Sequence, residues 1–181
     1  MYDITHLLTD RLLLRRPVAS DTDGYFAIYG DPQTNMFNPA GPLADRVQAE
    51  ARMASMLDRW EAHGWGTWAV SDQECPDELL GFGGLSDHLY GTERRTNLGF
   101  RFAAVAWGKG YATELAASAL QTAWRIGLDE VWGSVRENNL ASRRVLEKIG
   151  MLQVDKVQDP SGAAATIWYT ARQHALCSVA S

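Results

Sequence analysis

The sequence predicts one domain of mixed α/β class, with a mostly antiparallel central sheet of about seven strands flanked by about four helices. Its 181 residues are enough to build one substantial hydrophobic core. Residues 65–105 carry the apolar pattern of three consecutive strands with short connections, which is typical of an antiparallel meander. Helical apolar spacing appears on both sides of this meander. We therefore treat residues 1–181 as a single domain.

The N-terminal third predicts one strand followed by two helices. Residues 6–17 (HLLTDRLLLRRP) alternate, with Leu12 and Leu14 on one side, and are expected to form one strand. Ser20 is expected to cap a short helix, and NPAGP to form a loop. Apolar residues then recur at helical spacing up to Gly64, namely Leu43, Val47, Ala51, Ala54, Leu57 and Trp60.

The remaining elements follow from the same patterns. The meander strands are expected at residues 65–72, 78–90 and 95–105, a long helix between Gly110 and Gly127, and a strand at 130–137. A capped helix then ends at Gly150. Strands at 151–159 and 165–176 close the chain as a pair.

Composition excludes several classes of function. The net charge is −5 with dispersed basic residues, which argues against nucleic-acid binding and mildly favours a cationic or amine substrate. No apolar run is long enough to cross a membrane, so a cytoplasmic protein is expected. Cys75, Cys177 and the scattered histidines support neither a disulfide framework nor a metal site.

A turn of Gly108, Lys109 and Gly110 stands directly before the long helix. Such a turn brings unpaired amide N–H groups to the positive end of the helix dipole, which suits a phosphate, although it can also serve only to shape the chain. A P-loop requires Ser or Thr after the lysine, where this chain has Gly110. A dinucleotide fingerprint requires a third glycine, where this chain has Thr113. Both nucleotide interpretations, including an NAD-dependent oxidoreductase, are therefore disfavoured.

Three ordered motifs resemble one known family. WGKGYATE (107–114), NNLASRRVLEKIGM (138–151) and LTDRLLLRRP (8–17) are similar to motifs of the GNAT acetyltransferase superfamily. Within it they resemble the branch of ribosomal-protein N-terminal alanine acetyltransferases. The superfamily's phosphate motif, Arg/Gln-x-x-Gly-x-Gly/Ala, falls on residues 107–112, with Trp107 in the first position.

The resemblance implies acetyl-CoA as cosubstrate and no metal. It implies that the strand before the turn, at Phe102 with Arg101 and Ala103, offers backbone groups to the pantetheine arm. The amides that would bind the pyrophosphate belong to Gly108, Lys109, Gly110, Tyr111 and Ala112.

The same resemblance assigns roles to Asn139 and Ser142. Asn139 would hydrogen-bond the pantetheine, and Ser142 would lie near the coenzyme's sulfur as the catalytic residue, where a hydroxyl can hydrogen-bond or protonate the departing thiolate. A purely structural role is also open, because Asn138 or Asn139 must cap this helix and serine is common in a first turn.

The implied activity is direct transfer of an acetyl group to a primary amine, at a protein N-terminus or on a small molecule. Asn97 stands where many relatives carry a glutamate, and an amide cannot accept the amine's proton. Glu93, Asp87 and His88 are substitute candidates for the base. The alternative function, motivated by Asn97, is a non-catalytic acyl-CoA-binding or interaction module.

Acceptor selection is expected from the segments NPAGPLADR and SDHLYGTERR. Trp65, Trp68 and Trp132 are candidates to line an acceptor pocket, although strand aromatics usually belong to the core. Members of the branch often form dimers, which makes a homodimer one expectation.

Overall fold

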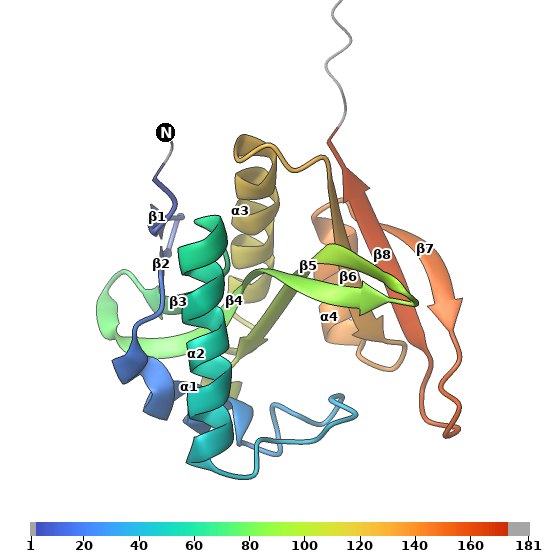
Figure 1. Cartoon of the computed structure of the whole chain (residues 1–181), viewed down its shortest axis with the longest axis horizontal. Coiled ribbons are helices and arrows are strands. Elements are labelled where there is room, and N and C mark those ends of the chain that lie inside the picture. The colour runs from blue at the N-terminus through green and yellow to red at the C-terminus, as the bar shows by residue number, and fades with distance from the viewer. Residues whose placement is uncertain (1–2, 174–181) are drawn as a thin grey trace, which may run out of the picture.

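The computed structural model describes residues 3–173, which form an eight-stranded sheet in the order β1-β2-β3-β4-β5-β6-β8-β7 (Figure 1). Residues 174–176 of the last predicted strand, and Cys177, lie outside the described residues. The strands are β1 (His6–Leu8), β2 (Leu12–Arg15), β3 (Thr67–Asp72), β4 (Cys75–Tyr90), β5 (Glu93–Phe102), β6 (Glu130–Arg136), β7 (Leu152–Val157) and β8 (Thr166–Arg172).

The predicted antiparallel meander is confirmed as β3–β4–β5, and β5–β6 is the parallel pair of the described sheet. The predicted first strand was wrong in one respect, because it breaks into the hairpin β1–β2. Thr9 closes this hairpin by donating its N–H to the carbonyl of Leu12 at 3.0 Å. The expected inward side of the strand is confirmed, since Leu12 and Leu14 are fully buried.

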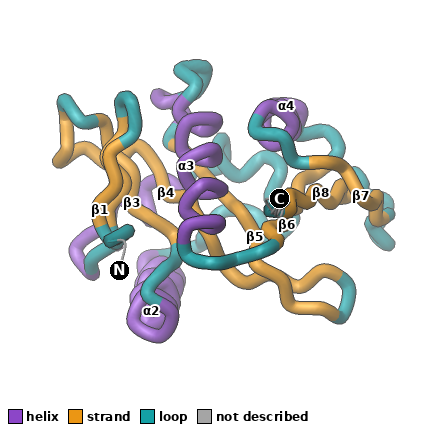
Figure 2. Tube along the Cα trace, turned by 90° about the horizontal axis from the view of Figure 1, so that it is seen from above, coloured by secondary structure: helices purple, strands orange, loops and turns teal. Residues whose placement is uncertain are grey.

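Four α-helices cover the two faces of the sheet, as expected: α1 (Thr22–Tyr29), α2 (Arg46–His63), α3 (Tyr111–Arg125) and α4 (Leu140–Lys148). Figures 1 and 2 place α2 on one face and α3 and α4 on the other. Leu115 of α3 and Leu146 of α4 belong to the larger core cluster, whereas Tyr25 of α1 and Met53 of α2 pack around Phe82. The C-terminal end of β5 therefore lies between the layer of α1 and α2 and the layer of α3 and α4.

Ser20 does not cap α1. A short 3₁₀ helix, Ala19–Asp21, precedes α1, and the Asp21 carboxylate accepts the N–H of Val18 at 2.8 Å. Asp21 also forms an ion pair with Arg15 at 2.7 Å. This carboxylate offers two oxygens to these donors, so it rather than the neighbouring hydroxyl organises the turn.

The expected apolar stripe of α2 is partly wrong. Val47 is 70% exposed, and the buried residues of the helix are Ala49, Met53 and Trp60. The expected end is confirmed, because Gly64 follows in the left-handed conformation.

A carboxylate on α3 joins this helix to the N-terminal hairpin. Glu114 accepts hydrogen bonds from the Thr9 hydroxyl at 2.6 Å, from the Arg11 N–H at 2.7 Å and from Arg11 Nε at 2.8 Å. Burial by itself raises the pKa of Glu114, but these hydrogen bonds outweigh it and hold that pKa below its usual value. Glu114 is therefore a tertiary anchor, beyond any interaction with its own helix dipole.

We expect Glu114→Ala to lower the free energy of unfolding by about 1–3 kcal/mol, because three donors lose a largely buried charged acceptor. Urea unfolding measures this loss. The matched control is Glu50→Ala, which removes an exposed ion pair with Arg46 on α2 and should change stability by less than about 0.5 kcal/mol. Equal effects of the two substitutions would contradict the anchoring role.

Candidate active site

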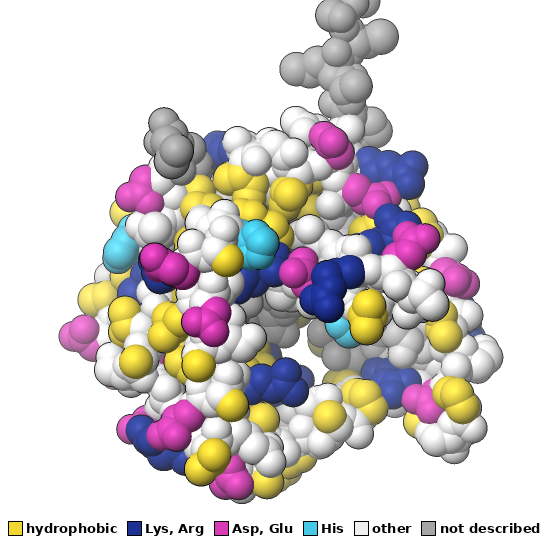
Figure 3. All heavy atoms as spheres, viewed as in Figure 1, with side chains coloured by type: hydrophobic (Ala, Val, Ile, Leu, Met, Phe, Trp, Pro, Cys, Tyr) yellow, Lys and Arg dark blue, Asp and Glu magenta, His cyan; other side chains and the backbone are white. Residues whose placement is uncertain are grey.

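A cleft opens where β5 and β6 separate. The two strands pair at Asn97 and Trp132 and then diverge toward Phe102. The resulting space is about 880 Å³ and is lined by β5, the glycine turn, α3, α4, β6, β8, His88 of β4 and the loop residues 33–34 and 36–39. Figure 3 shows a hollow on this face of the molecule, with Lys and Arg side chains around it.

The glycine turn forms one wall of the cleft. Gly108 and Gly110 have φ of +74° and +82°, a left-handed conformation that favours glycine. The N–H groups of Thr113 and Glu114 donate to the carbonyl of Gly110. No group within residues 3–173 accepts a hydrogen bond from the backbone N–H groups of residues 108–112. The turn thus presents unpaired donors at the positive end of α3.

The predicted pyrophosphate residues do not all face the cleft. Gly108, Gly110, Tyr111 and Ala112 line it, but Lys109 does not. The carbonyl of Lys109 instead accepts a hydrogen bond from Arg11 Nη1 at 2.8 Å. Lys109 therefore ties the turn to the N-terminal hairpin.

The freed edge of β5 is centred on Phe100. Ala103 donates its N–H to Leu80 of β4 at 2.8 Å, so the alternation of an antiparallel pair turns the backbone groups of Phe100 and Phe102 away from β4. The Phe102 carbonyl is already used by the indole N–H of Trp107 at 3.0 Å. Because pairing with β6 occurs at Asn97, the N–H and carbonyl of Phe100 open onto the cleft.

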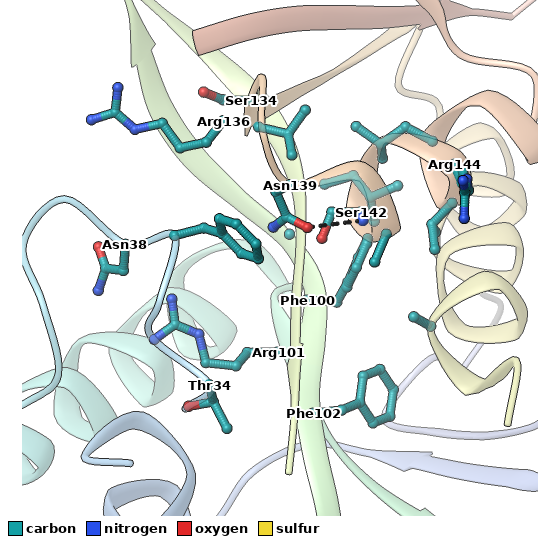
Figure 4. A pocket seen from close by; sticks show the side chains of 18 of the residues that line it. Thr34, Asn38, Phe100, Arg101, Phe102, Ser134, Arg136, Asn139, Ser142 and Arg144 are labelled. Carbon is teal, nitrogen blue, oxygen red and sulfur yellow. Dashed lines mark hydrogen bonds between the residues drawn. The ribbon is translucent and has the colours of Figure 1, made fainter. Parts of the chain in front are cut away.

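The start of α4 forms the opposite wall. Asn139 caps this helix by accepting the N–H of Ser142 at 3.1 Å, and both residues line the cleft (Figure 4). The structural role considered for Asn139 is therefore present, and its side chain also borders the cleft. Ser142 points its hydroxyl into the space beside Phe100.

Comparisons with known proteins agree with this architecture. A family model described as an acetyltransferase (GNAT) domain matches residues 11–152. The chain belongs to the GNAT acetyltransferase family. This GNAT chain is 28% identical over 149 residues to the uncharacterized protein YkkB of Bacillus subtilis, covering 81% of the chain and 85% of YkkB.

Solved structures show the same GNAT fold. An acetyltransferase from Agrobacterium tumefaciens matches with a TM-score of 0.77 at 25% identity, covering 96% of this chain and 97% of that one. The yncA protein of Salmonella typhimurium, solved with its cofactor acetyl-CoA, matches with a TM-score of 0.72 at 15% identity. That match covers 94% of this chain and 99% of yncA.

Asn97 is held by a partner within this GNAT domain. The buried Tyr90 donates its hydroxyl to Asn97 Oδ1 at 2.7 Å, and burial raises the pKa of Tyr90. The amide nitrogen of Asn97 lies over Gly99. Asn97 thus presents donors near the cleft and accepts no proton.

The three substitute bases differ in their surroundings. Asp87 pairs with Arg59 at 2.5 Å, and Glu93 pairs with Arg95. His88 lines the cleft, its ring packs edge-on against Tyr90, and partial burial lowers its pKa. His88 is therefore the candidate that faces the cleft in its neutral, proton-accepting form.

The predicted acceptor segments do reach the cleft, through Asn38 and Pro39 of the first and His88 of the second, whereas Met36 and Phe37, just before the first segment, were missed. The tryptophans behave differently from one another. Trp68 is fully buried and donates to the carbonyl of Ile4 at 2.8 Å, while Trp65 lies beneath Arg59. Trp132 packs against Tyr90, behind the lining. Trp168 of β8 lines the cleft but was missed, because an aromatic residue in a strand carries no local signal that separates a lining position from a core position.

The charge of the cleft differs from that of the whole chain. Of residues 3–173, those that line it include no Asp or Glu, but they include Arg101, Arg136, Arg144 and Lys148. The expectation of a site for cationic substrates, drawn from net charge, does not fit this lining. The same described residues contain no cluster of His, Cys, Asp or Glu that could hold a metal ion and no helix able to span a membrane.

We expect Gly108→Ala to cost about 1 kcal/mol of stability, because alanine is strained at positive φ, and to weaken coenzyme A binding about tenfold by displacing the amide donors. The control is Gly127→Ala, at φ +86° beyond the end of α3, where an added methyl also meets nothing within 4 Å. It should cost similar stability without changing coenzyme affinity. Thermal unfolding and calorimetric titration measure both effects, and equal affinities for the two variants would refute the prediction.

Proposed function

We propose that this GNAT domain is an acetyl-CoA-dependent N-acetyltransferase that acts on a primary amine by direct transfer. The observation that carries the proposal is the convergence, on one cleft, of the free backbone edge of Phe100 and the unpaired amides of Gly108, Gly110, Tyr111 and Ala112. Both features suit a long anionic ligand with an amide-containing arm. Membership of the family supports the same activity.

The residues present fit coenzyme A. The amides of Gly108, Gly110, Tyr111 and Ala112 would bind its pyrophosphate, and the carbonyl of Phe100 would accept an N–H of its pantetheine arm. Arg144 and Lys148 stand one turn apart on α4, in the same cleft, where no carboxylate opposes the coenzyme's negative charge within the described chain. When bound, acetyl-CoA supplies the acetyl group as a thioester.

The chain's own groups divide the proton transfers. His88 takes the proton of the attacking amine, directly or through one water. The N–H of Phe100 stabilises the negative charge that develops on the carbonyl oxygen. Ser142 donates a proton to the departing thiolate as the carbon–sulfur bond breaks, and a proton from solvent restores its hydroxyl. The positions of these three groups around one cleft support this division.

The test is a thiol-release assay with acetyl-CoA and a panel of amino acids, peptides with varied N-termini and diamines. We expect acetyl-CoA to raise the thermal midpoint and at least one amine to release thiol. Coenzyme binding without turnover of any amine would favour the non-catalytic alternative. A well-folded protein whose midpoint does not respond to saturating acetyl-CoA would contradict both.

Ser142→Ala should lower kcat about 100-fold, because it removes a proton donor used only as the thiolate leaves, and should change KM little. Steady-state kinetics on any amine found by the screen measure this split. The control is Ser55→Ala on the exposed face of α2, which should retain wild-type kcat. An unchanged kcat in Ser142→Ala at saturating substrates would remove serine from this role.

The role proposed for His88 as base predicts an acidic limb in the pH profile of kcat/KM. Because its pKa is lowered from 6.5, kcat/KM should lose this base only below that pH. Arg95, opposite on β5, and the ring of Tyr90 are the charged and titratable neighbours of His88. His88→Gln should lower kcat/KM about 100-fold at pH 7 and abolish this limb. Glu93→Gln is the control, and a limb that survives in His88→Gln would overturn the assignment.

A further inference from the structure

Arg101 brings a positive charge to the cleft without a carboxylate partner among residues 3–173. It lies on β5, on the face that also carries Asn97, because alternate residues of a strand share a face. Its Nη1 donates to Oδ1 of Asn35, and its guanidinium lies over the ring of Tyr29 at 4.6 Å. Both partners are neutral, so the charge is held in place but not compensated.

Neighbouring arginines are compensated in a way that Arg101 is not. Arg136, which also lines the cleft, pairs with Asp159 at 2.8 Å and donates to the carbonyl of Ala164 at 2.6 Å. Arg95, on the same face of β5, pairs with Glu130 at 2.8 Å. A guanidinium has five N–H donors, and the described contacts of Arg101 use one of them. The others are free to bind a planar anion.

The position of Arg101 separates it from the proposed coenzyme site. Figure 4 shows Arg101 extending toward the loop that carries Thr34 and Asn38, on one side of the cleft. Ser142 and Arg144 lie on the other side, with α4. The cations that suit the coenzyme's phosphates are thus on the α3–α4 side, and Arg101 faces the space left for the acceptor.

Apolar residues surround the same space. Met36, Phe37 and Pro39 of the loop, together with Trp168 of β8, line the same cleft as Arg101. An acceptor that enters here meets an apolar wall and one uncompensated guanidinium. Polyamines and other polycations would meet only positive charge, since no Asp or Glu of the described chain lines the cleft.

We propose that Arg101 forms an anion subsite for the acceptor, so that the preferred amines also carry a carboxylate. The inference rests on the proposed acetyl transfer and narrows its substrate class to amino acids or short peptides with an apolar side chain and a free carboxylate. The planar fork of Arg101 suits a carboxylate geometrically, and loss of such a charged pair is costly.

The test compares matched acceptors that differ only in this group: leucine, leucylglycine and 6-aminohexanoate, each against its primary amide. Rates are referred to the concentration of unprotonated amine, because amidation changes the amine's pKa. We expect the wild type to favour at least one carboxylate over its amide by about tenfold or more in kcat/KM. Arg101→Gln should bring that ratio near one, and Arg101→Lys should keep part of it.

Arg94→Gln is the matched control, since Arg94 is exposed on the same strand, points to the opposite face and does not line the cleft. It should keep the wild-type ratio. If Arg101 only positions the loop through Asn35, Arg101→Gln will slow carboxylate and amide equally, and the proposal is overturned. A wild-type ratio near one also overturns it, while leaving acetyl transfer intact.

A binding measurement tests the anion subsite at Arg101 even if no amine is acetylated. The N-acetylated form of each acceptor is added with coenzyme A, and the thermal midpoint is measured. We expect a larger shift with the carboxylate than with the amide in the wild type, and equal shifts in Arg101→Gln. Equal shifts in the wild type would reject the subsite. Absence of thiol release with every amine would instead reject the proposed function.

Discussion

The structure depends on a parallel strand pair, β5 and β6, whose strands pair at one position and then diverge. β5 and β6 meet at Asn97 and Trp132, and β5 continues to Phe102 without a neighbour on that side. A buried strand edge normally pairs with another strand, because unpaired backbone groups are costly. Here the edge at Phe100 borders a cleft instead. A ligand with a backbone-like amide arm can complete the sheet at this edge.

Hydrogen bonds from residues distant in the sequence fix the walls of the cleft. Trp107 covers the Phe102 carbonyl, which limits the free edge to Phe100. Arg11 donates hydrogen bonds to both the Lys109 carbonyl and the Glu114 carboxylate, although it lies 98 and 103 residues from them in sequence. The glycine turn is flexible by composition, so its shape is set by this contact with the N-terminal hairpin. Stability of β1–β2 and coenzyme affinity should therefore be linked.

Elements that depend on local sequence could be predicted from the sequence. The meander, the long helix ending before Gly127 and an asparagine cap at 138 or 139 follow from short-range spacing and capping chemistry, and all are present, with Asn139 as the cap. The glycine turn, Asn139 and Ser142 could be placed on the cleft because each sits in a contiguous motif. Val47 shows the limit of periodicity, since an apolar residue at helical spacing lies 70% exposed when no partner packs on that side of the helix.

Pairings between distant segments could not be predicted. The break of the first strand at Thr9, the anchor at Glu114 and the bond from Tyr90 to Asn97 depend on which elements become neighbours. The choice of Phe100 rather than Phe102 as the free edge depends on strand register, which one residue of shift would reverse. Choosing among the candidate bases likewise required seeing which carboxylates are already paired.

Charge gives the sharpest contrast between sequence and site. A chain of net charge −5 attracts cations over long distances, and on that ground alone a cationic acceptor was expected. Binding, however, is decided at the lining, where Arg101 and Arg136 stand and no acidic side chain of residues 3–173 is found. Within the cleft the solvent screens little, so the local charges outweigh the distant ones. An amine that also carries a carboxylate reconciles the two: its ammonium group is tolerated by the acidic surface, and its carboxylate by the arginine.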